Sequence, residues 1–185
     1  MARLTAFNFT TLNGYFKGPD DDISWNQHNQ GEENDYAKEG ANSGSTLIFG
    51  RVTYEMMARY WPSPDALKNN PVVAKGMNES EKIVFSRTLQ KADWHNTRII
   101  KNNMLEEMKK LKQQSGKSFT ILGSGSIVSQ LAEAGLVDEY QIMLNPVALG
   151  DGATLFKGIQ HPLQLKLTSH RVFKCGAVLL SYEPA

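Results

Sequence analysis

The segment with the clearest chemical potential is a run of small residues between two apolar stretches. Phe119–Leu122 has the length and apolar character of a strand, Gly123–Ser126 follows it directly, and Ile127–Ala134 continues with helical spacing. Small residues at a helix start leave backbone N–H groups exposed, and the helix dipole adds partial positive charge there. This pattern favours a phosphate or pyrophosphate ligand. A tight strand-to-helix turn that binds nothing is the alternative.

Hydroxyl and guanidinium side chains follow two further apolar runs. Gly50 precedes Arg51 and Thr53 at the start of an expected helix, and Ser86 and Arg87 come after the next apolar run. These groups suit phosphate oxygens, although each set alone also fits a capped helix or a solvated turn. Open α/β sheets bind ligands at the carboxyl ends of their strands. The three segments together therefore predict one ligand with a pyrophosphate and an additional phosphate, which describes NADP(H).

The strands and helices that must position these residues follow from the spacing of apolar side chains. Eight short runs have strand length, and most are bounded by Gly, Pro, Asn, Asp or Ser: Leu4–Phe9, Thr46–Phe49, Lys82–Phe85, Arg98–Ile100, Ser118–Leu122, Glu139–Leu144, Leu163–Leu167 and Ala177–Tyr182. Helices are expected at Glu32–Ala41, Val52–Tyr60, Met104–Leu111 and Ile127–Ala134. Alternating strands and helices predict a largely parallel sheet, and the last three strands predict an antiparallel finish. We therefore expect one α/β domain with a mixed sheet over residues 1–185.

Composition excludes several classes of protein. The 20 Lys and Arg residues nearly balance 19 Asp and Glu residues, whereas nucleic-acid-binding domains usually carry a basic excess. No window approaches the roughly 18 consecutive apolar residues of a membrane span, and the first residues are too polar for a signal peptide. The single cysteine, Cys175, excludes an internal disulfide framework, and the four histidines lack the spacing of metal ligands. We expect a cytoplasmic protein without a metal, nucleic-acid or membrane partner.

Six segments, taken in order, also carry a resemblance that spans nearly the whole chain. They are Thr11–Asp20 with Trp25, Phe49–Glu55, Val84–Thr88, Leu122–Ser126, Gly135–Tyr140 and Asn145–Gly152 with Leu155-Phe156. The sequence resembles the dihydrofolate-reductase-like superfamily. Its nearest branch is the reductase domain at the C-terminus of the riboflavin-biosynthesis protein RibD, with its stand-alone bacterial relatives. The resemblance implies a three-layer α/β/α fold with a mainly parallel eight-stranded sheet and NADPH laid across the strand ends.

The same resemblance implies roles for individual residues on the cofactor side. The cofactor-binding residues would be Gly50, Arg51 and Thr53 at the phosphates, Ser86 and Arg87 at the 2′-phosphate, and Gly123, Ser124, Gly125, Ser126 and Ile127 at the pyrophosphate. The segment Asn13–Asp22 would match a mobile loop that closes over nicotinamide and substrate. Dihydrofolate reductases usually carry paired glycines joined by a cis bond in the pyrophosphate loop. Gly123-Ser124 departs from that pattern and leaves the geometry of this bond open.

On the substrate side the resemblance implies four residues. Asn8 would reach the pocket from the first strand, and Trp25 resembles a tryptophan beside the substrate pocket. Dihydrofolate reductases hold a carboxylate in the helix after the mobile loop, where it binds the pterin and assists protonation. Asp35 and Glu33 are the candidates for this catalytic role. A helix rich in Glu, Asp and Lys is also typical of a solvated surface, which is the alternative.

These expectations describe an NADPH-dependent reductase that transfers hydride to a pterin- or pyrimidine-type heterocycle. By similarity, the reaction would be that of a 5-amino-6-(5-phosphoribosylamino)uracil reductase or of a dihydrofolate reductase. The alternative is a non-catalytic NADP(H)-binding or redox-sensing protein that keeps the cofactor site without substrate chemistry. The resemblance also implies a homodimer, for which no residue marks a subunit contact.

Overall fold

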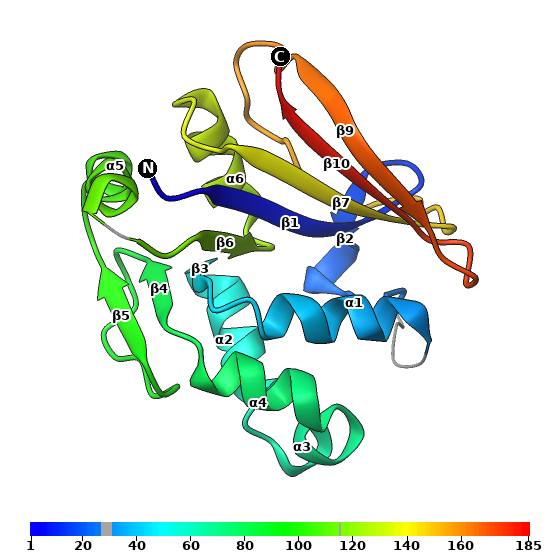
Figure 1. The fold of residues 1–185 in the computed structure, drawn as a ribbon, viewed down its shortest axis with the longest axis horizontal. Coiled ribbons are helices and arrows are strands. Elements are labelled where there is room, and N and C mark those ends of the chain that lie inside the picture. The colour runs from blue at the N-terminus through cyan, green and yellow to red at the C-terminus, as the bar shows by residue number, and fades with distance from the viewer. Residues whose placement is uncertain (27–30, 115) are drawn as a thin grey trace.

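An eight-stranded sheet runs through the centre of the computed structural model, which describes residues 1–26, 31–114 and 116–185 (Figure 1). The strands, in their order across the sheet, are β5 (Thr97–Ile100), β4 (Lys82–Phe85), β3 (Thr46–Gly50), β6 (Phe119–Leu122), β1 (Leu4–Thr11), β7 (Glu139–Asn145), β10 (Val178–Pro184) and β9 (Leu165–Val172). All pairs from β5 to β7 are parallel, whereas β10 is antiparallel to both β7 and β9. The predicted parallel sheet with an antiparallel finish is confirmed.

Helices cover both faces of this sheet and complete three layers. They are α1 (Glu32–Ala41), α2 (Arg51–Tyr60), α3 (Pro64–Asn69), α4 (Pro71–Glu79), α5 (Met104–Gln114) and α6 (Gly125–Glu133), with a 3-10 turn, η1, at Pro19–Asp21. In Figure 1, α1, α2 and α4 lie on one side of the sheet, and α5 and α6 lie on the other. Within the described residues, no helix is both long and apolar enough to cross a membrane.

Strand β3 shows why both faces need a helical cover. All five of its residues are buried, as is typical of a strand inside a parallel sheet. Successive side chains of a strand point to opposite faces. Ile48 accordingly joins the core that contains Met108 of α5, whereas Phe49 joins the core that contains Tyr54 of α2. The sheet is therefore packed on both sides at the point where β3 ends.

The four predicted helices all form, but α3 and α4 are not predicted by apolar spacing. Both are short, and each has a proline in its first turn, at Pro64 and Pro71. Proline fits this position because the first N–H groups of a helix have no partner inside the helix. The Ser63 hydroxyl also accepts a hydrogen bond from the Ala66 N–H over 3.2 Å and so caps α3. These caps are the local signals that could have identified both helices.

Strand β9 begins and ends later than predicted. The expected run was Leu163–Leu167, whereas β9 covers Leu165–Val172. All its residues after the first are exposed, and the apolar alternation of Leu163, Leu165 and Leu167 starts before the strand and stops inside it. The sequence pattern therefore does not mark its boundaries. Its position comes from pairing with β10 at the edge of the sheet.

A two-stranded ribbon lies outside the main sheet and includes most of the segment that was expected to be a mobile loop. Strand β2 (Tyr15–Lys17) pairs antiparallel with β8 (Ala153–Thr154), and η1 follows β2. Gly152 permits this pairing, because its φ is 146° and a Cβ there would lie 2.3 Å from the Lys17 carbonyl oxygen. The segment 13–22 is therefore built around a β-ribbon that depends on a distant part of the chain.

Candidate functional site

The three strand ends singled out in the sequence are neighbours in the structure. Strands β4, β3 and β6 lie side by side and run parallel, so their carboxyl ends share one edge of the sheet. Gly50 at the end of β3 pairs in register with Phe85 at the end of β4. Ser86, Arg51 and Gly123 therefore leave the sheet from adjacent strands, as the sequence predicted.

Ser124 joins two of these strand ends directly. Its hydroxyl accepts a hydrogen bond from the Gly50 N–H over 2.7 Å and donates one to the Thr53 hydroxyl over 2.9 Å. The approach is so close that a Cβ on Gly50 would lie 3.2 Å from Ser124 Oγ and 3.3 Å from Ile127 Cγ1. The turn before α2 and the turn before α6 thus form one hydrogen-bonded unit.

The Gly123-Ser124 peptide bond is trans, which settles the geometry that the sequence left open. Both residues instead adopt left-handed conformations, with φ values of 61° and 60°. This conformation is uncommon for a serine, and the two hydrogen bonds of its hydroxyl hold Ser124 in place. The turn before α6 therefore contains no side chain larger than serine from Gly123 to Ser126.

The electrostatics of this edge favour an anion. Helices α2 and α6 both begin here, and neither has an acidic residue in its first turn. Their first N–H groups have no partner within the helix and lie at the positive end of the helix dipole. Arg51 adds a guanidinium, which also pairs with Glu55 over 2.9 Å one turn further along α2. Phosphate oxygens are the natural partners of such a set of donors.

A cleft of about 1090 Å³ opens beside this edge. One part of its wall holds eight predicted cofactor residues: Gly50, Arg51, Thr53, Gly123, Ser124, Gly125, Ser126 and Ile127. Another part holds side chains from β1, α1 and β7, namely Phe7, Asn8, Phe9, Asn34, Tyr36 and Gln141. The ribbon contributes Phe16 and Lys17. The cleft thus combines a phosphate-type edge with an aromatic and amide-bearing region.

The predicted 2′-phosphate residues lie at the next strand end, outside the cleft wall. Ser86 Oγ accepts hydrogen bonds from the N–H groups of Thr88 and Leu89 over 3.2 and 3.0 Å, and so stabilises a turn. Arg87 is exposed, and no carboxylate in the described part of the chain forms an ion pair with it. Arg87 therefore offers a guanidinium beside the cleft, while the Ser86 hydroxyl is engaged with the backbone.

The predicted substrate residues Asn8 and Trp25 have polar atoms without partners. Asn8 lines the cleft, is 2% exposed, and neither its Nδ2 nor its Oδ1 has a hydrogen-bond partner among the described residues. The Trp25 Nε1 is likewise buried and has no hydrogen-bond partner within the described part of the chain. Trp25 itself does not line the cleft, although the adjacent Asn26 does. Buried polar groups usually find partners, so these atoms are unusual.

The structure does not bring Asp35 into the cleft. Its side chain is 65% exposed and pairs with Lys38 over 2.7 Å, one turn further along α1. The hydrogen bond from the Lys38 ammonium holds the pKa of the Asp35 carboxyl below its usual value. The Glu33 side chain lies outside the described part of the structure. Asp35 therefore follows the solvated-surface alternative.

Tyr36, the next residue of α1, lines the cleft instead. Its hydroxyl donates to Gln141 Oε1 over 2.8 Å, and Gln141 Nε2 donates to Glu139 Oε1 over 3.1 Å. Burial raises the pKa of the Tyr36 hydroxyl to about 12, so this group stays protonated at neutral pH. The sequence-based site omitted Gln141 and gave Tyr36 no role. A polar Gln within the apolar run Glu139–Leu144 was the available signal.

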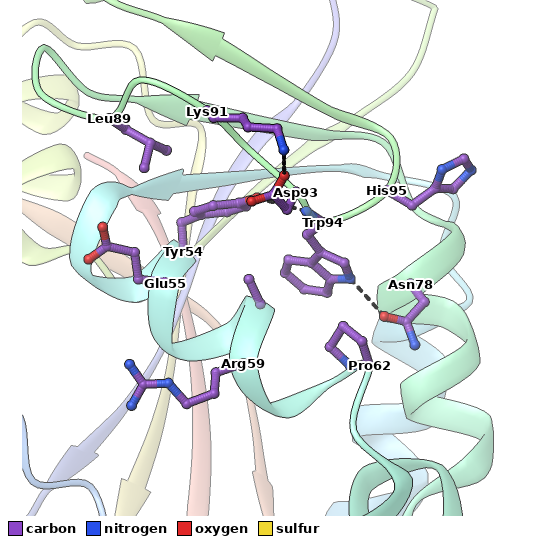
Figure 2. A pocket seen from close by; sticks show the side chains of 11 residues that line it. Tyr54, Glu55, Arg59, Pro62, Asn78, Leu89, Lys91, Asp93, Trp94 and His95 are labelled. Carbon is purple, nitrogen blue, oxygen red and sulfur yellow. Dashed lines mark hydrogen bonds and ion pairs between the residues drawn. The ribbon is translucent and has the colours of Figure 1, made fainter.

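A second pocket, of about 680 Å³, lies on the other side of α2 (Figure 2). Its polar groups are mostly engaged with one another. Trp94 Nε1 donates to Asn78 Oδ1 over 2.7 Å, the Trp94 N–H donates to the Tyr54 hydroxyl over 3.1 Å, and Lys91 pairs with Asp93. This pocket therefore presents a partnered surface, in contrast to the unpartnered Asn8 in the cleft.

Comparison with known proteins adds to this geometry. The family model described as the RibD C-terminal domain matches residues 2–179. The uncharacterized protein YyaP of Bacillus subtilis (strain 168) is 29% identical over 175 residues, which cover 94% of this chain and 90% of that protein.

Solved structures show the same fold. A putative riboflavin biosynthesis protein from Shewanella sp. PV-4 matches with a TM-score of 0.75 at 19% identity, over 100% of this chain and 99% of that chain. Dihydrofolate reductase from Enterococcus faecalis, in complex with NADP(H), matches with a TM-score of 0.65 at 19% identity, over 98% and 96% of the two chains. The fold is therefore dihydrofolate-reductase-like, and these two likenesses show the fold alone.

Proposed function

Because the chain belongs to the RibD C-terminal domain family, we propose that it is a reductase that uses NADPH to reduce a flat, nitrogen-containing heterocycle of pterin or pyrimidine type. One observation carries this proposal. The ends of β4, β3 and β6 are adjacent, and two helix N-termini and two arginines gather there beside a large cleft. Families with this fold carry many activities, so the function rests on the site rather than on the fold.

The residues present fit NADPH. The N–H groups at the start of α6 suit the pyrophosphate. Gly125 lets the Phe16 ring pack against this helix start, because a Cβ there would lie 3.0 Å from that ring. Arg51 and Thr53 reach the same anion from α2. Arg87 suits the additional 2′-phosphate, because a free guanidinium matches phosphate oxygens. When bound, NADPH supplies the hydride.

The opposite part of the cleft suits a planar, neutral heterocycle. Phe7 and Tyr36 have ring centroids 5.8 Å apart and offer aromatic surface. The Tyr36 hydroxyl and the Gln141 amide offer hydrogen bonds and are held in place by their contact with each other. Asp21 is the one carboxylate that lines the cleft among the described residues, and Lys17 pairs with it. The described wall therefore favours a neutral ring with amide-type edges over a cationic one.

The proposal is tested by measuring binding and turnover together. We expect the wild-type protein to bind NADPH more tightly than NADH, and to oxidise NADPH when dihydrofolate or the phosphoribosylamino-uracil is added. The Arg87→Ala variant should bind NADPH about tenfold more weakly and NADH unchanged, because only NADPH carries the 2′-phosphate. Arg59→Ala, an exposed arginine beside the pocket in Figure 2, is the matched control.

Two results would contradict the proposal in different ways. Equal weakening of NADPH and NADH by Arg87→Ala would remove the 2′-phosphate assignment. If the protein binds NADPH tightly but oxidises it with neither dihydrofolate nor the phosphoribosylamino-uracil, a non-catalytic NADP(H)-binding protein would be favoured.

A further inference from the structure

Asn8 lines the cleft with a buried side chain whose two polar atoms both lack a partner among the described residues, whereas Asn26, also in the cleft wall, lacks one at Oδ1 alone. Asn8 is 2% exposed, and both of its amide atoms lack hydrogen bonds to described residues. An amide buried in this way costs free energy, because it loses its hydrogen bonds to water and gains none. The wall of the cleft therefore contains one hydrogen-bond donor and one acceptor, both on Asn8, without partners among the described residues.

A second buried asparagine of the sheet, Asn145, has hydrogen-bond partners, in contrast to Asn8. Asn145 on β7 is also 2% exposed, but its Nδ2 donates to the carbonyl oxygens of Thr10 and Met143, each over 3.1 Å. Asn145 does not line the cleft, whereas Asn8 does. The difference between the two residues thus follows their position relative to the cleft.

The register of the sheet places Asn8 beside the predicted pyrophosphate turn. The last residue pair between β1 and β6 is Phe7 with Leu122. Asn8 and Gly123 are the next residues of their strands, at the point where the two strands stop pairing. Asn8 shares a strand face with the buried Ala6, and Ile127 of α6 belongs to the same core as Ala6. Asn8 therefore lies on the α6 side of β1, next to the turn before α6.

We propose that the Asn8 side-chain amide pairs with a planar amide edge of the bound ligand, donating one hydrogen bond to its oxygen and accepting one from its N–H. A carboxamide on a nicotinamide ring and a lactam on a heterocyclic substrate both present this edge. The inference rests on the proposed reductase function. Both amide atoms of Asn8 are closed off from solvent, so the proposed pairing requires neighbouring side chains to move aside.

The test compares Asn8→Leu with Asn145→Leu, since leucine has nearly the shape of asparagine without its polar atoms. In the ligand-free protein we expect Asn8→Leu to raise the Tm by about 2 °C or more, because it removes an unsatisfied amide. Asn145→Leu should lower the Tm, because it leaves two carbonyl groups without their donor. A merely structural role for Asn8 predicts a lower Tm for both variants.

Binding measurements then identify which ligand presents the amide edge to Asn8. The probes are NADPH, 2′-phospho-ADP-ribose, which lacks the nicotinamide ring, and 5,6-diaminouracil, which carries a lactam. We expect Asn8→Leu to weaken either NADPH or 5,6-diaminouracil by about tenfold while 2′-phospho-ADP-ribose binds unchanged. Loss of NADPH binding assigns Asn8 to the carboxamide, and loss of 5,6-diaminouracil binding assigns it to the substrate lactam.

Three results would overturn the inference. They are unchanged binding of both amide-bearing probes to Asn8→Leu, equal weakening of 2′-phospho-ADP-ribose, and a lowered Tm of the ligand-free variant. Wild-type protein that binds 5,6-diaminouracil but not NADPH would overturn the proposed function. The effect of Asn8→Leu on 5,6-diaminouracil binding would then still test the role of Asn8. Wild-type protein that binds none of the probes would overturn both.

Discussion

Lys82 shows how one residue can hold two elements together without an opposite charge. Its side chain is 1% exposed, and its Nζ donates to the carbonyl oxygens of Asn78, Ser80 and His95 over 3.0, 2.7 and 3.0 Å. The ammonium also lies 4.4 Å from the centroid of the Trp94 ring. Lys82 thereby ties the end of α4 to the connection between β4 and β5, at the opposite end of β4 from Arg87.

Replacing Lys82 tests this role through stability. Lys82→Met should lower the free energy of unfolding at pH 7 by roughly 2 kcal/mol, because three carbonyl groups lose their donor. The measurement is chemical denaturation, with the exposed Lys109→Met as the control. An unchanged free energy of unfolding would show that these contacts contribute nothing.

The same residue predicts a pH dependence. Burial lowers the pKa of Lys82 from 10.5 to about 8 in the folded protein. Between about pH 8 and 10.5 the unfolded chain therefore binds more protons at this site, so the free energy of unfolding rises with pH, by about 1 kcal/mol after solvent screening. The difference in stability between wild type and Lys82→Met should grow over this range. A difference that shrinks would mean that the carbonyl contacts raise the pKa instead.

Residue types at the strand ends allowed much of the candidate site to be predicted. Gly50, Arg51 and Gly123 were found because glycine, small polar residues and arginine after apolar runs have a direct chemical meaning. Asp35 was predicted to supply a carboxylate to the substrate, but it does not line the cleft. The composition of α1 does not show which of its faces meets the cleft. The pairing of Tyr36 with Gln141 joins residues far apart in sequence, so no local pattern indicated it.

At the scale of elements, the ribbon of β2 and β8 forms part of one wall of the cleft. It places Phe16 and Lys17 in that wall, and Phe16 packs against the start of α6 next to Gly125. The ribbon exists because Gly152 brings β8 within contact of Lys17. Elements of this kind are hard to predict, since β2 and β8 are too short to show alternation. The strands of the main sheet other than β9, in contrast, contain apolar runs that are long enough to be recognised.

The substitution Gly152→Ala should separate β8 from β2. The new Cβ would meet the Lys17 carbonyl oxygen, and the φ of 146° disfavours any side chain. We expect the free energy of unfolding to fall by about 1–3 kcal/mol and NADPH to bind more weakly, since Phe16 moves away from α6. Gly150→Ala is the matched control, because nothing lies within 4 Å of a Cβ at that position. Wild-type stability and binding in Gly152→Ala would show that the ribbon does not shape the cleft.

At the scale of the whole molecule, the sheet order brings the chemistry to one edge. The chain returns from α5 to insert β6 between β3 and β1, so the turn before α6 lies between the turn after β3 and the end of β1. Parallel strands place all these ends at the same edge, where open α/β sheets bind ligands. Helices cover both faces of the part of the sheet from which these ends emerge (Figure 1). The cleft therefore lies where the topology gathers donors from segments far apart in the sequence.

A crystal structure with NADPH bound tests the central claim most directly. The account predicts the pyrophosphate at the N–H groups of the Gly123–Ser126 turn, the 2′-phosphate within hydrogen-bond distance of Arg87, and the nicotinamide ring in the cleft beside Phe7. A dinucleotide found in the pocket of Figure 2, or strand ends left empty at saturating NADPH, would contradict it.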